Sequence, residues 1–430
     1  MARLTTADFS NNAEPCVLRY TTVDFKMPNI ETKAFDADII EYSYSNGVGC
    51  ITFNKPISCI ADNAFYNCDN LQSIVIPDCV ISIGQSAFFG CTNLIEVKTP
   101  NCLMHIENNT FCECRSLEKI DIPDSVVSIG NSSFCECTNL KTLVIPDNVT
   151  SIGNRAFYNC SSLENISIGK GIVKILHEAF CGCTGKLTIN CDIPNPLRHR
   201  MRLSSETYGA FYGAMFSQII FGKDVTSIGD YAFEYCKQIR DIFIPYNVTL
   251  IGQSAFRQCN NLTTVTIHNN ITSIGNCAFE DCHMLERVSI ADDIQDDSNI
   301  EASIGNSAFK NCSNLKNITL PRKTHSIGSS AFSNCCTITN VYIPKSIKFI
   351  GCEAFAGCTN LAHLEIGEGV ESIGSWAFAD CNNIVYIVCK PTMPPKLGGD
   401  LFNFALNVKI NIPNGCEKAY LNSDWRKYLE

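Results

Sequence analysis

One motif recurs along most of this 430-residue chain at a nearly fixed interval, and this repeat limits what the chain can fold into. A phenylalanine, usually preceded by alanine, occurs in fourteen copies, and most successive copies lie 23 residues apart. Periods of about 20–50 residues are typical of solenoids, in which each unit packs on its neighbours. We therefore predict a stack of short coils, although a chain of this length ordinarily forms about two to four domains. The fourteen phenylalanines are Phe65, Phe88, Phe111, Phe134, Phe157, Phe180, Phe211, Phe233, Phe256, Phe279, Phe309, Phe332, Phe355 and Phe378, and a degenerate copy follows at Phe402.

The aligned copies share the pattern Leu-x-x-Ile-x-Ile-Pro-x-x-Val-x-x-Ile-Gly-x-x-Ala-Phe-x-x-Cys, and residues 117–137 hold a good copy. In this copy Ile120 and Ile122 alternate with period two, which predicts a short strand with one buried face. Pro123 should end the strand, because proline cannot donate a hydrogen bond to a ladder. Each coil is therefore expected to contribute one short strand.

The second half of the pattern supplies the rest of the core. Val126 and Ile129 turn a second apolar edge inward, Gly130 allows a close backbone approach, and Phe134 fills the widest part of the coil. A single coil cannot bury these side chains alone, so neighbouring coils must stack. Stacked strands about 4.8 Å apart would form a parallel sheet, with each phenylalanine packed on the next.

A cysteine column accompanies the phenylalanines. In thirteen of the fourteen copies a cysteine lies three residues after the phenylalanine, and Ala214 is the exception. Because a reduced cysteine behaves as a small apolar residue, we predict a buried ladder of thiols. The column contains Cys68, Cys91, Cys114, Cys137, Cys160, Cys183, Cys236, Cys259, Cys282, Cys312, Cys335, Cys358 and Cys381, out of 27 cysteines in the chain.

Two other interpretations of the cysteines stay open. Disulfides could join neighbouring coils, although parallel side chains would keep their Cβ atoms beyond the favoured range of about 3.5–4.5 Å. A zinc ion could bind the four thiols of Cys112, Cys114, Cys135 and Cys137, although their spacing is not the usual one. We favour the packing role, and we predict neither a metal nor a cofactor. So many reduced thiols favour a reducing compartment.

The repeated unit Ile-Pro-x-x-Val-x-x-Ile-Gly-x-x-Ala-Phe-x-x-Cys resembles the BspA-type leucine-rich repeats of bacterial and protist surface proteins. The resemblance covers residues from about 51 to 389. The segment from Cys389 to Pro395 and the aromatic tail of Tyr420, Trp425 and Tyr428 are similar to the ends of such arrays in gut Bacteroidetes-type proteins. The resemblance implies a curved solenoid and a role in adhesion or in recognition of proteins or extracellular matrix.

The predicted fold is a leucine-rich repeat solenoid of the α/β type, a curved right-handed coil of about 14 repeats with a parallel sheet on one face. Open ends of a solenoid expose apolar core and strand edge, so atypical caps are expected. We assign residues 1–50 to an N-terminal cap, residues 51–389 to the repeats, and residues 390–430 to a C-terminal cap with a short helix. Tyr420, Trp425 and Tyr428 should cover the last coil.

Composition limits the classes of partner and the cellular locations that we expect. The net charge is −10, which is unlike the basic footprint of a nucleic-acid-binding protein. No apolar stretch is long enough for a transmembrane helix, and none near Met1 resembles a secretion signal. The family resemblance implies a cell-surface or secreted protein, whereas the lack of a visible signal leaves a cytoplasmic or virion-associated protein as the alternative. We expect a monomer.

Two insertions break the period and are candidate binding loops, because insertions in repeat arrays map to one face. The first, between Phe180 and Phe211, contains Arg198, Arg200 and Arg202, which could contact an acidic partner. The second, between Phe279 and Phe309, is acidic, but it lacks the ligand spacing of a calcium loop. Its acidic residues are Asp292, Asp293, Asp296, Asp297 and Glu301. Solvated charged loops are the simpler interpretation of both.

The outward positions of the predicted strands supply the other candidate ligand-binding residues. Phe243, Arg287, Tyr342 and Tyr386 occupy such positions, and these residue types dominate the hot spots of protein interfaces. They are spread over several coils, so an ordinary surface remains the alternative.

No catalytic motif accompanies the repeats. The sequence contains no phosphate-binding glycine loop, no His-Glu-x-x-His and no nucleophile elbow, and its seven histidines are scattered. We predict that the protein is not an enzyme but a binding or adhesion solenoid, which recognises a protein, extracellular-matrix or glycan partner through its sheet face and loops. The alternatives are a structural component of a virion or cell envelope, or an intracellular scaffold.

Overall fold

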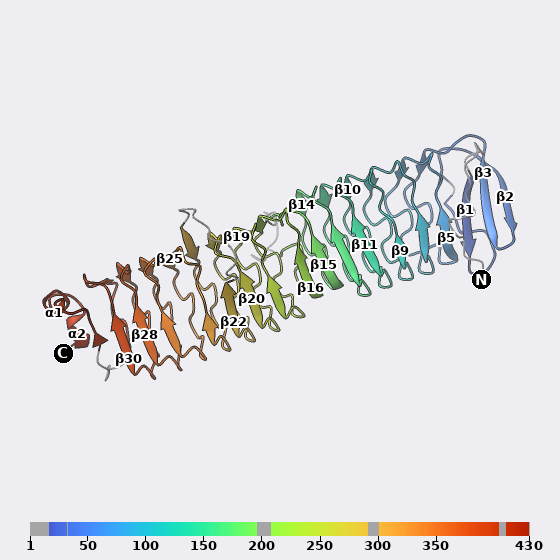
Figure 1. The fold of residues 1–430 in the computed structure, drawn as a ribbon. Coiled ribbons are helices and arrows are strands. Elements are labelled where there is room, and N and C mark those ends of the chain that lie inside the picture. Colours follow the sequence, from blue (N-terminus) through green and yellow to red (C-terminus); the bar gives the residue numbers. More distant parts are fainter. Residues whose placement is uncertain (1–16, 32, 196–207, 291–300, 404–409, 430) are drawn as a thin grey trace. The chain divides into compact units, whose positions relative to one another are not determined.

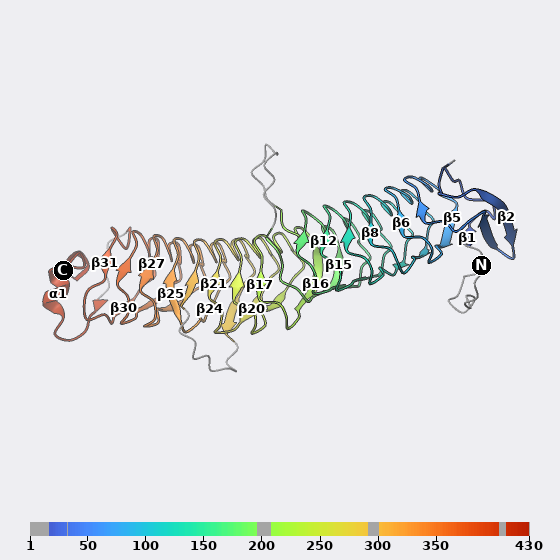
Figure 2. The same cartoon turned by 90° about the horizontal axis from the view of Figure 1, so that it is seen from above.

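The computed structural model describes residues 17–31, 33–195, 208–290, 301–403 and 410–429. These residues divide into two compact units. The first contains the described part of Met1–Cys191 together with Gly213–Ile220, and the second contains the described part of Asp192–Tyr212 together with Phe221–Glu430. In each unit the strands follow one another as the rungs of a stack (Figures 1 and 2). The prediction of a solenoid with about 14 turns of about 23 residues is confirmed.

Every coil contributes one strand to a parallel sheet formed by the Leu-x-x-Ile-x-Ile segments. In the first unit these strands pair in register, so that Leu143 lies beside Ile166, and Ile166 beside Leu187. The strands of this kind are β5 (Leu71–Val75), β7 (Glu96–Lys98), β9 (Lys119–Ile120), β11 (Thr142–Ile145), β13 (Asn165–Ile168), β15 (Thr184–Ile189) and β16 (Met215–Phe221). In the second unit they are β18 (Asp241–Phe243), β20 (Thr264–Ile267), β22 (Arg287–Ile290), β24 (Asn317–Ile318), β26 (Asn340–Tyr342), β28 (His363–Ile366), β30 (Tyr386–Cys389) and β32 (Ile410–Asn411).

A second set of parallel strands was not predicted, and it corrects the expectation of an α/β repeat with one sheet. These strands are formed by the Ser-Ile pair, or its equivalent, that precedes the repeated glycine. In the first unit they are β4 (Cys59–Ile60), β6 (Ser82–Ile83), β8 (His105–Ile106), β10 (Ser128–Ile129), β12 (Ser151–Ile152) and β14 (Lys174–Ile175). In the second they are β17 (Ser227–Ile228), β19 (Leu250–Ile251), β21 (Ser273–Ile274), β23 (Ala302–Ile304), β25 (Thr324–Ile327), β27 (Phe349–Ile350), β29 (Ser372–Ile373) and β31 (Lys396–Leu397).

The glycine that follows each short strand is needed for close approach between coils. A Cβ atom on Gly153 would lie 2.5 Å from the backbone nitrogen of Asn131 and from the carbonyl carbon of Gly130. Real Cβ atoms do not approach backbone atoms so closely. The predicted role of this glycine is therefore confirmed.

The Ala-Phe segment forms a turn where a leucine-rich repeat of the α/β type would have a helix. The residues two before and two after the phenylalanine have positive φ, as Arg155 (52°) and Asn159 (56°) do around Phe157, except for Gly209 before Phe211. Alternate N–H groups then donate to the following coil: Phe157 N–H to the Ala179 carbonyl at 2.8 Å, and Asn159 N–H to the Cys181 carbonyl at 2.8 Å. Left-handed residues on both sides of the phenylalanine prevent a helix there.

The phenylalanine rings form the predicted columns, one in each unit. Adjacent rings in the first unit have centroids 5.0–5.3 Å apart and planes within 14° of each other. In the second unit, from Phe211 to Phe378, the centroids are 5.0–5.5 Å apart. All fourteen rings are buried. The core of each unit is thus continuous along the stack.

The cysteine column is buried beside the rings, and all thirteen of its thiols are reduced. Twelve of them donate the S–H hydrogen to the carbonyl of the ladder phenylalanine in the preceding coil, at Sγ–O distances of 3.0–3.4 Å. Cys160, for example, donates to Phe134. This geometry agrees with the predicted packing role and not with disulfides between coils. Cys79, outside the column, is disulfide-bonded.

Different elements lie at the two ends of the chain. Three antiparallel strands, β1 (Val17–Thr22), β2 (Ile39–Ser45) and β3 (Val48–Phe53), extend the first sheet, and β1 pairs with β5. Two short helices, α1 (Glu417–Leu421) and α2 (Arg426–Leu429), follow β32. Tyr420 and Trp425 are buried, and their side chains donate to the carbonyls of Pro391 and Pro395. The division into caps at 1–50 and 390–430 around repeats 51–389 stays a proposal. Within the described residues no helix is long and apolar enough to span a bilayer.

Removing one ring should weaken the stack strongly. Phe157→Ala is expected to lower the free energy of unfolding by about 3–5 kcal/mol, because it leaves a cavity between two packed rings. Urea unfolding followed by circular dichroism measures the loss. Phe243→Ala, at an exposed strand position, is the control and should stay within about 0.5 kcal/mol of the parent protein. A loss below about 1 kcal/mol for Phe157→Ala would contradict the structural role of the column.

The buried thiols should make the protein sensitive to alkali. The pKa is raised for ten of the thirteen column cysteines; burial is the largest cause for most, and for Cys91 and Cys358 it is a hydrogen bond with the next column thiol. Burial raises the pKa of Cys282 to about 12. The unfolded chain therefore loses protons first as the pH rises, and stability falls above the ordinary thiol pKa of about 8.5.

Each such thiol contributes a slope of about 1.4 kcal/mol per pH unit in this range. We expect the melting temperature to be steady near neutrality and to fall steeply between about pH 9 and 10. A Cys160→Ala variant should show a shallower fall, because one titrating group is removed. A melting temperature that is constant up to pH 10.5 would show that the column does not stay protonated.

Candidate functional site: a tyrosine-lined pocket with a charged ladder

The four predicted sheet-face residues are exposed, but the structure does not bring them together. Phe243 in β18 is 57% exposed, and its ring contacts His268 edge-on at 5.5 Å. Arg287 lies in β22, on the other side of β20. The pairing places Phe243 beside Thr266 and Arg287 beside Thr264, so the two side chains belong to different rows of the sheet.

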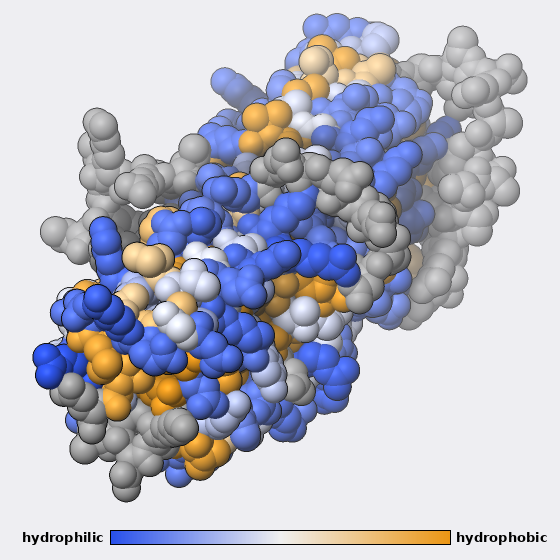
Figure 3. Space-filling view, turned by 60° about the vertical axis from the view of Figure 1, so that its left-hand side comes forward, coloured by the Kyte–Doolittle hydropathy of each residue, from blue (hydrophilic) through white to orange (hydrophobic). Residues whose placement is uncertain are grey.

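Tyr342 and Tyr386 belong to another sheet of the second unit. Tyr342 in β26 pairs with Glu365, whereas Tyr386 in β30 pairs with His363, so β28 separates them. Tyr342 is 66% exposed, and the ring of Tyr386 lies 6.1 Å from that of His363. A view of the surface shows apolar residues in small groups between polar ones (Figure 3). The four residues remain candidate contacts. Arg198, Arg200, Arg202 and the acidic residues 292–297 lie outside the described residues.

A pocket that sequence reasoning missed lies on the turn side of the second unit. Its volume is about 420 Å³, and its lining comes from the turns of consecutive coils. Four tyrosines line it: Tyr208, Tyr212, Tyr231 and Tyr235. The remaining lining is polar and includes Glu234, Gln253, Arg257 and Glu280. Aromatic surfaces with a few fixed polar groups are typical of ligand sites.

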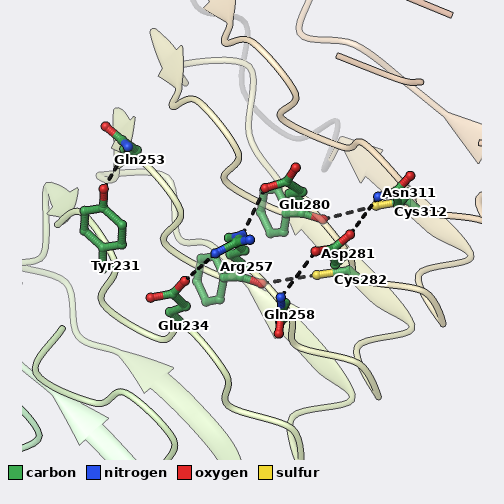
Figure 4. A network of polar contacts seen from close by, with 12 residues as sticks. Tyr231, Glu234, Gln253, Arg257, Gln258, Glu280, Asp281, Cys282, Asn311 and Cys312 are labelled. Carbon is green, nitrogen blue, oxygen red and sulfur yellow. Dashed lines mark hydrogen bonds and ion pairs between the residues drawn. The ribbon is translucent and has the colours of Figure 1, made fainter. Parts of the chain in front are cut away.

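The charged residues of the pocket form a ladder across three coils (Figure 4). Glu234, Arg257 and Glu280 each follow the ladder phenylalanine of their coil directly, so they stack at one repeat position. Arg257 Nη1 lies 3.1 Å from Glu234 Oε1, and Arg257 Nε lies 2.9 Å from Glu280 Oε2. The side chains are 6%, 34% and 15% exposed, respectively. Burial alone would lower the pKa of Arg257, but the two ion pairs raise it, which keeps the guanidinium charged.

A second polar ladder runs beside the first. Asp281 accepts hydrogen bonds from Gln258 at 3.3 Å and from Asn311 at 2.8 Å, through different carboxylate oxygens. Tyr231 accepts a hydrogen bond from Gln253 at 2.8 Å (Figure 4). These contacts join side chains that lie about one repeat apart in the sequence. The polar wall of the pocket is therefore held in one arrangement before any ligand binds.

Two of the tyrosines have left-handed backbone conformations. Tyr231 and Tyr235 have positive φ, 57° and 62°, at the two left-handed positions of their turn. Most other coils have Asn, Ser, Asp, Glu or Gly there, and an L-residue pays about 1–2 kcal/mol in this region. The ring of Tyr212 lies 4.3 Å from Tyr208 and 5.1 Å from Tyr235, so the aromatic wall is continuous.

The chemistry of the pocket suits recognition. Two carboxylates face one guanidinium, which leaves a net charge of −1 among these three groups. Both carboxylates pair with Arg257. Among the described residues no three His, Cys, Asp or Glu side chains gather in a way that could hold a metal ion. Two of the four thiols considered for zinc, Cys114 and Cys137, donate to phenylalanine carbonyls in the buried column.

A signal for this pocket is present in the sequence. The residues after the ladder phenylalanines read Glu234, Arg257, Glu280 and Lys310 on four successive coils, which alternates in sign. Four of the fourteen tyrosines lie within residues 208–235. Reading each repeat position as a column, as was done for the cysteines, would have found both features.

The repeats match a known family. A BspA-type leucine-rich repeat region, in six copies, matches residues 58–186, 206–301 and 297–409. This chain belongs to the BspA-type leucine-rich repeat family. The resemblance of the repeated motif to that family is therefore confirmed. Leucine-rich repeat solenoids are typically non-enzymatic scaffolds, and proteins of this class commonly take part in protein interactions.

Solved structures of bacterial leucine-rich repeat proteins are similar to this BspA-type chain. One from Bacteroides ovatus ATCC 8483 is 24% identical, covers 88% of this chain and 99% of its own, and has a TM-score of 0.61. A leucine-rich cell surface protein from Faecalibacterium prausnitzii A2-165 is 21% identical, covers 96% of this chain and 98% of its own, and has a TM-score of 0.36. The Bacteroides ovatus structure supports the assignment of a leucine-rich repeat fold. No curated protein matches the sequence.

Arg257 should hold the pocket together, because it neutralises two shielded carboxylates. Arg257→Ala is expected to cost at least about 2 kcal/mol of unfolding free energy, somewhat less than the 3–5 kcal/mol of a fully buried pair. Urea unfolding at pH 7 measures the loss. Arg287→Ala, an exposed arginine, is the matched control, and equal losses for the two variants would contradict this role.

Proposed function

We propose that this BspA-type protein is a non-catalytic recognition solenoid that binds an extracellular partner through the tyrosine-lined pocket of its second unit. The observation that carries the proposal is the fixed Glu234–Arg257–Glu280 ladder beside a wall of tyrosines. Preorganised polar groups lose little entropy on binding, and tyrosine offers a large contact area with only two rotatable side-chain bonds.

The partner is a protein, a matrix component or a glycan that presents polar groups next to a flat apolar surface. Such a surface can pack on the tyrosine rings, while hydroxyl or amide groups pair with the charged ladder. The outward residues Phe243, Arg287, Tyr342 and Tyr386 are a second candidate contact set, because their residue types are frequent at interface hot spots. Their separation over two sheets makes them suited to a partner that covers several coils.

The location that fits this function is the cell surface or the extracellular space. The family relationship supports it, and the burial of the thiol column would protect those cysteines in an oxidising environment. We further propose that the protein acts as a monomer, since each core column is completed within its own unit by neighbouring coils. An intracellular scaffold or an envelope component remains the competing function.

The test is a binding screen followed by paired variants. The purified full chain is applied to arrays of extracellular-matrix proteins and of glycans, and every captured ligand is titrated by biolayer interferometry. Tyr231→Ala/Tyr235→Ala should weaken binding at least about tenfold, as loss of a hot spot does. Val144→Ala, which trims an exposed apolar side chain in the first unit, is the control and should bind as the parent does.

The outcomes separate the candidate surfaces. A loss confined to Phe243→Ala/Arg287→Ala or Tyr342→Ala/Tyr386→Ala would move the site to the sheet face and reject the pocket. Equal binding by all of these variants, with melting temperatures unchanged, would reject both surfaces. An array on which nothing is captured would count against an extracellular recognition role.

A further inference from the structure

We propose that Cys112 and Cys135 form a dithiol site in the first unit, which a hydroperoxide oxidises to a disulfide joining two consecutive coils. Neither thiol belongs to the buried cysteine column. Each directly follows a ladder phenylalanine, Phe111 or Phe134, on the turn side of the coil. The site is independent of the recognition pocket, which belongs to the second unit.

The backbone holds the two cysteines opposite each other. The N–H of Phe111 donates to the Ser133 carbonyl at 2.8 Å, and the N–H of Glu113 donates to the Cys135 carbonyl at 2.7 Å. These bonds flank Cys112 and fix the register of the two turns. In the two preceding coils, Tyr66 and Phe89 occupy the same repeat position, and their ring centroids lie 5.0 Å apart. Equivalent positions of stacked coils lie about 4.8 Å apart, which falls within the Cα–Cα range of about 4.4–6.8 Å that a disulfide requires. The two Cβ atoms must approach slightly, to about 3.5–4.5 Å, as the bond forms.

The two thiols occupy the same position of two stacked turns, and they differ in character. Both are reduced. Cys112 is only 7% exposed, whereas Cys135 is partly exposed. The neighbouring Cys112 thiol is the main factor that lowers the pKa of Cys135, and the Cys135 thiol is the main factor that raises the pKa of Cys112. Cys135 is also the more exposed of the two, so it is the sulfur that more readily carries charge.

Some of the groups around the pair lower the pKa of Cys135, and others raise it. Arg155 lowers the pKa of Cys135, whereas burial and the carboxylates of Glu136 and Glu113 raise it. Cys137 and Glu113 add to the rise of the pKa of Cys112. Cys135 is thus an accessible sulfur with a lowered pKa next to a second thiol, which is the arrangement that redox-sensitive cysteines require.

The chemistry proceeds in two balanced steps. The Cys135 thiolate attacks one oxygen of a hydroperoxide ROOH, the O–O bond breaks, and Cys135 becomes a sulfenic acid while ROH leaves after taking up a proton. The Cys112 sulfur then attacks the Cys135 sulfur, and the S–O bond breaks with release of water. Overall, two thiols and ROOH give one disulfide, ROH and water. The peroxide is reduced and the two sulfurs are oxidised.

Three nearby cysteines of the first unit lack either exposure to solvent or a partner thiol at the same repeat position. Cys114 and Cys137 are fully buried, and their S–H groups point to the carbonyls of Phe88 and Phe111. Cys181 occupies the same repeat position as Cys112 and Cys135, but the preceding coil has Tyr158 there. Burial raises the pKa of Cys181 to about 11. Cys181 is therefore a matched control, because it has the same place in the turn but no partner thiol.

The test uses the full chain under native conditions. The protein is treated with a small excess of hydrogen peroxide, the remaining thiols are alkylated, and peptides are identified by mass spectrometry without reduction. A peptide pair joined through Cys112 and Cys135, lighter by two hydrogen atoms than its separate parts, is the expected product. It should disappear after treatment with dithiothreitol, and it should form equally in Cys181→Ser.

Single variants assign the two roles. In Cys112→Ser no disulfide can form between the two positions, so Cys135 should accumulate as a sulfenic acid that dimedone traps. In the same variant Cys135 should be alkylated about tenfold faster than Cys181 at pH 7, since its larger thiolate fraction outweighs its lower intrinsic nucleophilicity. In Cys135→Ser the Cys112 thiol should remain unmodified. Circular dichroism melting confirms that each variant is folded.

Several results would overturn the proposal. Recovery of Cys112 and Cys135 as separately alkylated thiols, under peroxide that oxidises Cys181, would show that the pair is not reactive. Oxidation of Cys135 to a sulfinic acid with no linked peptide would show that Cys112 cannot reach it. Preferential linkage of column cysteines would place the reactive thiols elsewhere.

Discussion

Backbone hydrogen bonds in the turns set the register on which the rest of each unit depends. In the turn around Phe157, three alternate N–H groups donate to the following coil, and the same pattern recurs in both units. Every repeat position is thereby held against its counterpart about one strand spacing away. Stacked rings, buried thiols and paired short strands all follow from this register. A slip of one residue would remove each ring from its column, so the bonds and the core stabilise each other.

The register also decides what exposed side chains can do, because residues at one repeat position become neighbours. The position after the ladder phenylalanine shows three outcomes. Aromatic residues there stack, as Tyr66 and Phe89 do, and cysteines there form the thiol pair of Cys112 and Cys135. Opposite charges form the ladder centred on Arg257. In most folds such contacts join residues whose separation along the chain follows no rule. Here the period of the repeat determines which side chains become neighbours.

Much of the fold could be predicted from the period, because the alternation of isoleucines and the constant place of phenylalanine and cysteine leave few ways to bury them. The helix and the single sheet of an α/β repeat were wrongly expected, since the left-handed residues around Phe157 and the pairing of two-residue strands depend on contacts between coils. The pocket was missed for a related reason. Its tyrosines come from different turns and from different repeat positions, and the three-dimensional stack shows that Tyr212 and Tyr235 meet.

The structure separates the residues that stabilise the stack from those that can recognise a ligand. Core columns repeat with little variation, whereas the position after the phenylalanine carries Tyr, Phe, Cys, Glu, Arg, Lys, Ser or Ala. Left-handed turn positions usually carry small or polar residues, so the tyrosines at 231 and 235 depart from the repeat pattern without adding core. Selection for stability alone would not favour that choice. The side chains that depart from the repeat rule, and not those that obey it, therefore indicate where this BspA-type chain acts.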